Sequence, residues 1–299
     1  MVIGIVGLGV MGSAIARRLL AAGYPVQGYN RTAAKAAALA GLGMTQAATP
    51  CEAAQGTSVT FSVVSDGDAL AEVRDGPDGI LAGLPADGVY IDLSTVGPGA
   101  SDATRATAAE HGARFLAAPV SGSVATVEQG KLAFMVGGDE ATLEQVRPVL
   151  LDLGSAITHV GTVRQAAAMK LAVNLSIAAQ MIAFSEGVLL AERYGIATAD
   201  AVGILLRSAV ASPMLAYRGP FVIDPPAEPW FTIALARKDM RITMEVAEQA
   251  ALPLWSASAA AQVLAAADAM GYGQDELASV ASALRAMSAA RGGQPQAGA

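Results

Sequence analysis

Cysteine is almost absent from this chain, because Cys51 stands alone among 299 residues. A single cysteine excludes internal disulfides and is typical of a reducing compartment, so we expect a cytoplasmic protein. Histidine is nearly as scarce, and His111 and His159 lie far apart in the sequence. Together with one cysteine they form no cluster with metal-ligand spacing, so we expect no metal site.

Basic residues are fewer than acidic ones, 19 against 26, and long apolar runs are absent. The formal net charge of −7 argues against nucleic-acid binding, which needs a basic face. No stretch reaches the roughly 18 uninterrupted apolar residues of a membrane-spanning helix. The longest candidate, Leu171 to Leu190, is interrupted by Asn174, Gln180 and Glu186. The chain starts without a basic segment, so we expect neither a signal peptide nor an anchor, and no membrane partner.

The first half of the chain alternates short apolar runs with alanine-rich helical patterns. The apolar runs are Val2–Val6, Val26–Tyr29, Val59–Val64, Val89–Leu93, Arg114–Ala117, Phe134–Val136 and Ile157–Val160. The helical patterns are Ser13–Ala22, Thr32–Ala40, Gly67–Val73, Gly99–His111 and Ala141–Leu151. Repeated strand-then-helix order predicts an α/β Rossmann domain with a doubly wound parallel sheet, over residues 1–161.

After Val160 the β-branched runs stop and long Ala/Leu/Met-rich segments begin. Gln165 to Tyr194 predicts one long joining helix, which is apolar on nearly every side and so must be buried against partners. Further helices are expected at Thr198–Ser208, Thr232–Gln249, Leu254–Met270 and Asp275–Met287. We therefore expect an all-helical substrate and dimerisation domain over 162–290, and a flexible Gly/Gln/Pro/Ala tail over 291–299.

The segment Gly7-Leu8-Gly9-Val10-Met11-Gly12 follows the first apolar run and opens a helical pattern. This arrangement is typical of a turn that cradles a dinucleotide pyrophosphate. Gly7 would make the tight turn, Gly9 would let the backbone approach the phosphates, and Gly12 would let the helix pack on the strand. Such a turn is weak evidence alone, because glycine-rich strand-to-helix turns are common.

The triplet Asn30-Arg31-Thr32 follows the second strand, where Rossmann folds contact the adenosine ribose. An NAD site usually places a carboxylate here, and none is present. Arg31 can fork onto a phosphate, Thr32 can donate a hydroxyl, and Lys35 adds a positive charge one turn later. We therefore predict NADP(H) in preference to NAD(H). The alternative is that Arg31 and Lys35 are ordinary solvated charges.

Lys170 and Asn174 stand four residues apart in the long helix, so they share one face. Burial removes water from a lysine ammonium and lowers lysine pKa values toward the range useful for passing a proton. Asn174 could hold a substrate oxygen. The alternative is a lysine that reaches solvent beside a satisfied asparagine.

Two further segments carry polar groups. Ala118-Pro119-Val120-Ser121-Gly122-Ser123 predicts a strand end with two hydroxyls around a glycine, before a helical segment Val124 to Gln129, and could clasp a carboxylate. It is not a hydrolase elbow, because Pro119 stands where G-x-S-x-G needs glycine. Arg237-Lys238-Asp239 lies inside a helix and could reach a cofactor. An ordinary capped turn and a solvated helix face are the respective alternatives.

Taken in order, these motifs resemble the β-hydroxyacid dehydrogenase family over nearly the whole chain. Its members include 3-hydroxyisobutyrate dehydrogenase, tartronate semialdehyde reductase and glyoxylate or succinic semialdehyde reductases. The family's fold is a Rossmann domain and an all-helical domain like the C-terminal domain of 6-phosphogluconate dehydrogenase, linked by a long helix. The motifs that carry the resemblance are the glycine turn, Asn30-Arg31-Thr32, Asp92-Leu93-Ser94-Thr95, Ala118 to Gly122, Gly130 with Met135-Val136-Gly137-Gly138, Lys170 with Asn174, and Lys238-Asp239.

The resemblance implies an NADP(H)-dependent oxidoreductase that transfers hydride between the nicotinamide and a small 3-hydroxy acid or semialdehyde acid, as a homodimer or homotetramer. It makes Lys170 the general acid that protonates the carbonyl oxygen, with Asn174 positioning that oxygen. Substrate contacts are implied for Ser121, Gly122, Ser123 and Thr95. Cofactor contacts are implied for Gly7, Leu8, Gly9, Val10, Met11, Gly12, Asn30, Arg31, Thr32, Lys35, Val64, Ser65, Thr95 and Lys238, with Asp239 as a structural partner.

The chain departs from the family pattern around the implied substrate loop. Ser123, Thr126 and Val127 replace two glycines and an alanine, Lys131 replaces a threonine, and Leu175 replaces a second asparagine. These side chains crowd the pocket, so the natural substrate stays open.

Two rival functions also stay open. Imine reductases share the glycine turn and the Asn-Arg-Thr triplet but usually lack the lysine. A catalytically silent NADP(H)-sensing protein would need only the Rossmann half.

Overall fold

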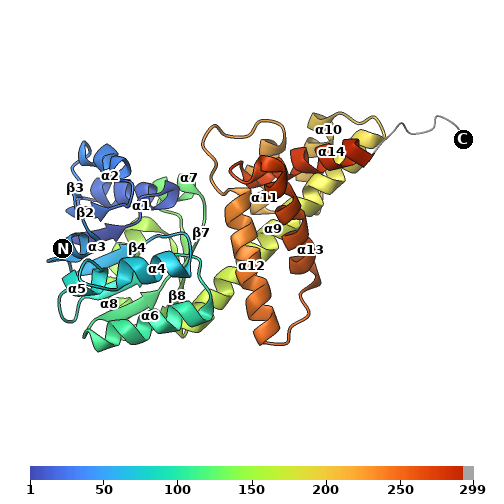
Figure 1. Ribbon diagram of the computed structural model, residues 1–299. Helices are drawn as coiled ribbons and strands as arrows, with labels where there is room; N and C mark the ends of the chain where they lie inside the picture. The colour runs from blue at the N-terminus through green and yellow to red at the C-terminus, as the bar shows by residue number, and fades with distance from the viewer. Residues whose placement is uncertain (292–299) are drawn as a thin grey trace, which may run out of the picture. The chain divides into compact units, whose positions relative to one another are not determined.

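The computed structural model describes residues 1–291 of the chain, which forms two compact units, Met1–Leu171 and the part that begins at Ala172 (Figure 1). The tail expected over 291–299 lies outside the described residues except for Arg291, which ends the last helix, α14.

The first unit is built on one sheet whose strands run in the order β3-β2-β1-β4-β5-β6-β8-β7, with β9 beside β8. Neighbouring strands from β3 to β6 are all parallel, as the sequence predicted. The strands are β1(Ile3–Val6), β2(Val26–Tyr29), β3(Thr45–Gln46), β4(Val59–Ser62), β5(Val89–Asp92), β6(Arg114–Ala117), β7(Val120–Ser121), β8(Ala133–Gly138) and β9(Ala156–Gly161).

The sheet is mainly parallel, as predicted, but β8 departs from this pattern, because it runs antiparallel to both β6 and β7. The reason lies in the connection. β7 follows β6 after two residues, and only the five-residue helix α7(Val124–Glu128) precedes β8. A parallel partner needs a long crossover across the sheet, whereas an antiparallel strand can simply return along its predecessors.

Helices cover both faces of this sheet, which makes the fold doubly wound (Figure 1). The alternation within β5 shows it, because Val89 and Ile91 pack in one core cluster and Tyr90 packs in the other. One face is covered by α1(Val10–Ala21), α2(Ala33–Ala40) and α8(Glu140–Leu153). The opposite face is covered by α3(Pro50–Ala54), α4(Gly67–Arg74), α5(Ile80–Gly83) and α6(Pro98–Glu110).

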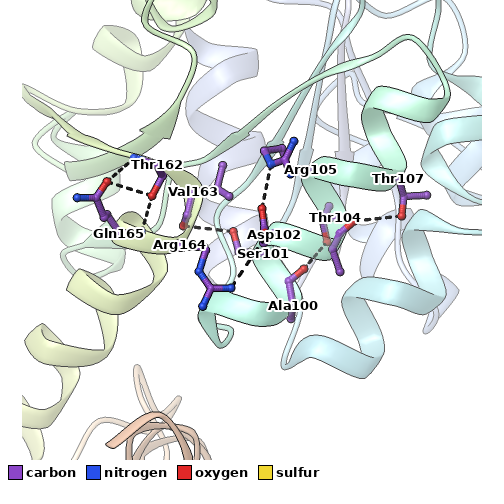
Figure 2. A network of polar contacts seen from close by, with 11 residues as sticks. Ala100, Ser101, Asp102, Thr104, Arg105, Thr107, Thr162, Val163, Arg164 and Gln165 are labelled. Carbon is purple, nitrogen blue, oxygen red and sulfur yellow. Dashed lines mark hydrogen bonds and ion pairs between the residues drawn. The ribbon is translucent and has the colours of Figure 1, made fainter. Parts of the chain in front are cut away.

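The long helix α9(Val163–Arg193) starts in the first unit with a reciprocal cap. The Thr162 amide donates to Gln165 Oε1 at 2.7 Å, and the Gln165 amide donates to Thr162 Oγ1 at 3.3 Å. The same turn is tied to α6, because Ser101 Oγ donates to the Val163 carbonyl at 3.4 Å and Arg164 faces Asp102 (Figure 2). The first turns of α9 are therefore fixed within the sheet unit.

The second unit is helical, as the sequence predicted. Its core gathers apolar side chains from the distal half of α9, such as Met181, Phe184 and Val188, with Met240 and Leu264 from later helices. The remaining elements are α10(Thr198–Arg207), α11(Pro213–Arg218), η1(Gly219–Val222), α12(Ile233–Gln249), α13(Trp255–Ala267), η2(Asp268–Tyr272), η3(Leu277–Ser279) and α14(Val280–Arg291).

Within residues 1–291, α9 is the one helix that is long and apolar enough to cross a membrane by length and composition. A single such helix is weak evidence, because the core helix of a soluble protein passes the same test. Met181 and Val188 of α9 are fully buried in the core of the second unit, which supplies a reason for this composition.

Candidate active site

Two glycines in the turn from β1 into α1 lie so close to other backbone atoms that neither position has room for a side chain. Gly7 has a φ of +97°, and a Cβ there would lie 2.2 Å from the Val63 carbonyl oxygen. A Cβ on Gly12 would lie 1.9 Å from the Gly7 oxygen. At Gly9, in contrast, a Cβ would meet no atom within 4 Å. The turn is thus packed against protein at Gly7 and Gly12 and open at Gly9, which fits close approach of a phosphate to the backbone.

Asn30 holds this turn in place. Its Oδ1 accepts the Leu8 amide at 2.8 Å, and its Nδ2 donates to the Thr32 carbonyl at 3.1 Å. The Gly7 amide donates to the Tyr29 carbonyl at 2.9 Å. Leu8 and Asn30 therefore shape the turn through their contacts with each other, and the first turn of α1, at Val10 and Met11, follows it.

Two basic side chains, Arg31 and Lys35, follow the end of β2. Arg31, Thr32 and Lys35 are all exposed, and Thr32 is the N-cap residue of α2. Neither the Arg31 nor the Lys35 side chain has an ion-pair partner within residues 1–291. Two solvated cations without a neighbouring carboxylate are what a 2′-phosphate would require.

A buried polar network joins the ends of β4 and β5. Asp92 is 1% exposed, and its Oδ1 accepts Ser62 Oγ at 2.6 Å and Ser94 Oγ at 2.7 Å. Ser94 Oγ in turn accepts the Val64 amide at 2.9 Å. The phenol of Tyr90 donates to Ser62 Oγ, and burial followed by the Asp92 charge raises the pKa of Tyr90 well above its ordinary value. The phenol is therefore a fixed donor.

This network positions two segments that the resemblance assigns to cofactor and substrate. Val64 is held through its amide, and the hydroxyl of the next residue, Ser65, donates to Asp66 Oδ2 at 2.8 Å. Thr95 follows directly on Ser94, which the Asp92 carboxylate fixes through both the amide and the hydroxyl. The ends of the two neighbouring parallel strands are thus locked together before any ligand binds.

Lys170 lies beside the loop with two hydroxyls. Its side chain is half-buried, and Nζ donates to the Val120 carbonyl at 2.8 Å. Val120 belongs to β7, and Ser121-Gly122-Ser123 follows it directly, with Gly122 at a φ of +147°. The first unit thus places a lysine ammonium next to a Ser-Gly-Ser turn, from elements that are 50 positions apart in the chain.

The second unit holds a compact polar group on α9 and α12. Asp239 is 1% exposed, and its carboxylate accepts Asn174 Nδ2 at 2.5 Å and pairs with Lys238 Nζ at 2.7 Å. Asn174 itself is 4% exposed. The expected role of Asp239 as partner of Lys238 is thereby extended, because Asp239 also fixes the amide of Asn174.

Two matches to protein families cover most of the chain. Residues 2–161 match the NAD binding domain of 6-phosphogluconate dehydrogenase, and residues 165–284 match the NAD-binding part of NADP-dependent 3-hydroxyisobutyrate dehydrogenase. The chain is 33% identical to glyoxylate/succinic semialdehyde reductase 2 of Arabidopsis thaliana over 95% of this chain and 79% of that protein. The chain belongs to the β-hydroxyacid dehydrogenase family.

Further relatives agree with this assignment. The dehydrogenase is 30% identical to 2-(hydroxymethyl)glutarate dehydrogenase of Eubacterium barkeri over 93% of each protein. A crystal structure of 3-hydroxyisobutyrate dehydrogenase from Salmonella typhimurium superposes with a TM-score of 0.87, at 26% identity, over 94% of this chain and 98% of that one. The protein is therefore an NAD(P)-dependent oxidoreductase with a Rossmann domain and a helical second domain.

Several residues that shape the site of this dehydrogenase were not assigned a role from its sequence. Val120 acts through a backbone oxygen, which no side-chain pattern reveals. Asp92 and Ser94 belong to a motif that carried the family resemblance, although only Thr95 was given a role. Among residues 1–291, no group of three or more His, Cys, Asp or Glu side chains is arranged to hold a metal.

Proposed function

We propose that this dehydrogenase reduces small semialdehyde acids with NADPH and oxidises the corresponding hydroxy acids in reverse, with Lys170 as the acid and base. The observation that carries the proposal is the hydrogen bond of 2.8 Å from Lys170 Nζ to Val120, which keeps a half-buried ammonium at the start of the Ser121-Gly122-Ser123 loop. Relatives named as semialdehyde reductases and as a hydroxy-acid dehydrogenase support the substrate class.

Each residue of the proposed site has a separate role in the reduction. The bound nicotinamide supplies the hydride. Lys170 donates a proton to the aldehyde oxygen as that oxygen gains the electron pair of the carbonyl bond, and the product is an alcohol. A positioned general acid contributes about 10²–10⁴ in rate. Ser121 binds the substrate carboxylate through its hydroxyl, and Gly122 lets the carboxylate come close to the backbone.

Three further roles follow from the family resemblance. Asn174 positions the carbonyl oxygen, and its own amide is held by Asp239 at 2.5 Å. Lys238 contacts the cofactor, with its ammonium kept in place by the same carboxylate. Thr95 contacts substrate and nicotinamide from a backbone segment that Asp92 fixes.

The preference for NADPH rests on the end of β2. Arg31 and Lys35 are exposed cations, and the triplet Asn30-Arg31-Thr32 contains no carboxylate to repel a 2′-phosphate. The double variant Arg31→Ala/Lys35→Ala should weaken NADPH binding and leave NADH binding almost unchanged. Equal losses for the two cofactors would contradict this reading of the triplet.

The function is tested with one substrate panel. Purified protein is mixed with NADPH or NADH and with glyoxylate, succinic semialdehyde, tartronate semialdehyde, methylmalonate semialdehyde or a cyclic imine, and absorbance at the nicotinamide band is followed. We expect oxidation of NADPH by at least one semialdehyde acid, faster than oxidation of NADH. Turnover of the imine alone, or of no compound, would overturn the proposal. The cytoplasmic location and the homodimer or homotetramer remain predictions.

A further inference from the structure

Thr126 reaches back from the third position of α7 onto the Ser121-Gly122-Ser123 loop. Its Oγ1 accepts the Ser123 backbone amide at 3.1 Å and lies 3.1 Å from Ser123 Oγ. Ser123 is only 8% exposed. The Ser123 amide is therefore already engaged by the Thr126 hydroxyl, and the Ser123 hydroxyl lies in the capping box at the start of α7.

The carbon atoms of Thr126 shape the same loop. A Cβ on Gly122 would lie 2.9 Å from Thr126 Cγ2 and 2.8 Å from Leu132 Cδ2. Gly122 has a φ of +147°, a conformation that favours glycine. Thr126 thus packs against the glycine that turns the chain as well as bonding to the serine that follows it.

The two serines of the loop are not equivalent. Ser121 is half-buried, and within residues 1–291 its hydroxyl makes no hydrogen bond to the protein. Ser123 is buried and bonded to Thr126. A carboxylate that approaches the loop would meet the Ser121 hydroxyl directly, but it could use the Ser123 amide only by breaking an existing hydrogen bond.

We propose that Thr126 is a specificity-determining residue that withdraws the Ser123 amide from the substrate, so that the carboxylate of a semialdehyde acid is held from the Ser121 side without this amide. The inference rests on the proposed function. It follows that Thr126 weakens the preference of the enzyme for a semialdehyde acid over the neutral aldehyde of the same length. Without the Thr126 hydroxyl, this preference should be stronger.

The test measures KM for succinic semialdehyde and for butanal, its four-carbon analogue without the carboxylate, at saturating NADPH. Thr126→Ala removes the oxygen that accepts the Ser123 amide and leaves room for a carboxylate oxygen in its place. We expect the KM for succinic semialdehyde to fall about fivefold, the effect of one hydrogen bond, and the KM for butanal to stay constant. Thr126→Val removes the same oxygen but puts a methyl in its place, so the amide stays covered and the ratio of the two KM values should not change.

Two controls make the result specific. Thr126→Ser keeps the oxygen and should restore the wild-type ratio. Thr107→Val makes the same substitution at a half-buried position of α6 whose hydroxyl bonds only within its own helix, and it should leave the ratio unaltered. An unchanged ratio in Thr126→Ala, or equal changes for acid and aldehyde, would overturn the inference while leaving the proposed function intact. Failure of the wild-type protein to reduce any aldehyde would overturn both.

Discussion

The ion pair between Arg218 and Glu276 offers a sharp test of what holds the second unit together. Arg218 Nη1 lies 2.9 Å from Glu276 Oε1, and the two side chains are 5% and 1% exposed. The other carboxylate oxygen accepts the amides of Trp230 and Phe231 at 2.8 and 3.1 Å. One buried carboxylate thus balances a guanidinium and fixes the chain just before α12, the helix that carries Lys238 and Asp239.

The expected cost of breaking this pair follows from its burial. Removing one partner of a buried pair leaves an uncompensated charge and costs about 3–5 kcal/mol of unfolding free energy. Glu276→Gln removes the charge but keeps an oxygen for the two amides, so a loss of about 3 kcal/mol is expected. Glu276→Ala also leaves the part-buried amides of Trp230 and Phe231 without their acceptor, at up to about 1–3 kcal/mol each. The double variant Arg218→Met/Glu276→Gln should be more stable than Glu276→Gln, because no unpaired charge remains.

Urea unfolding, followed by tryptophan fluorescence and circular dichroism, measures these differences. Glu245→Gln is the matched control, because Glu245 pairs with Arg241 on the surface and both side chains are more than half exposed. Surface pairs of this kind contribute less than about 1 kcal/mol. The reasoning is refuted if Glu276→Gln costs no more than Glu245→Gln, or if the effects of the two substitutions in the pair are simply additive.

Two further predictions concern the glycine turn and the acid side of the stability curve. Gly9→Ala should leave the melting temperature almost unchanged but weaken NADPH binding at least tenfold in a fluorescence titration, because its Cβ would enter open space that the phosphates need. Gly12→Ala should lower both the melting temperature and the affinity for NADPH, because its Cβ would collide with the Gly7 carbonyl. Arg285 and then Thr198 hold the pKa of Glu192 below its ordinary 4.5, so the folded state binds fewer protons than the unfolded state in that range. The stability that this carboxylate confers is present above pH 4.5 and is lost as the pH falls through the lowered pKa, and Glu192→Gln should flatten that loss in urea titrations at several pH values.

Each of these predictions has a contrary result. Normal NADPH affinity in Gly9→Ala would mean that the open face of the turn is not the phosphate site. A stability curve of Glu192→Gln that runs parallel to the wild type through the acid range would mean that the pair with Arg285, at 2.7 Å, does not govern acid unfolding.

Most long elements of the fold could be predicted from the sequence because their patterns are strong. The helix from Thr198 matches the observed α10 closely, since Val202, Leu205 and Leu206 recur at helical spacing. The helices α3 and α5 were not expected, because five and four residues are too few to show a helical period. The antiparallel direction of β8 could not be predicted, since apolar periodicity carries no information on strand orientation.

The candidate site was predictable only where a side chain was unusual for its surroundings. Lys170 stands out in an apolar helix, and the glycine turn stands out by its spacing. The contacts that hold these residues join distant positions, such as Asn174 with Asp239, 65 residues later. Other contacts use backbone atoms, such as the Val120 carbonyl that accepts Lys170 Nζ. Contacts of this kind depend on which distant segments the fold brings together, and the pattern of a single sequence does not predict that.

The proton-donor role of Lys170 is the central claim, and single-turnover kinetics test it most directly. Lys170→Met and Lys170→Arg are compared with the wild type for NADPH affinity and for the rate of NADPH oxidation by a semialdehyde acid. Arginine keeps a charge and can still bond to the Val120 carbonyl, but it does not release its proton. We predict near-normal NADPH affinity in both variants and a loss of at least about 10² in the rate, the lower bound for a general acid. A rate in Lys170→Met equal to that of the wild type would contradict the account.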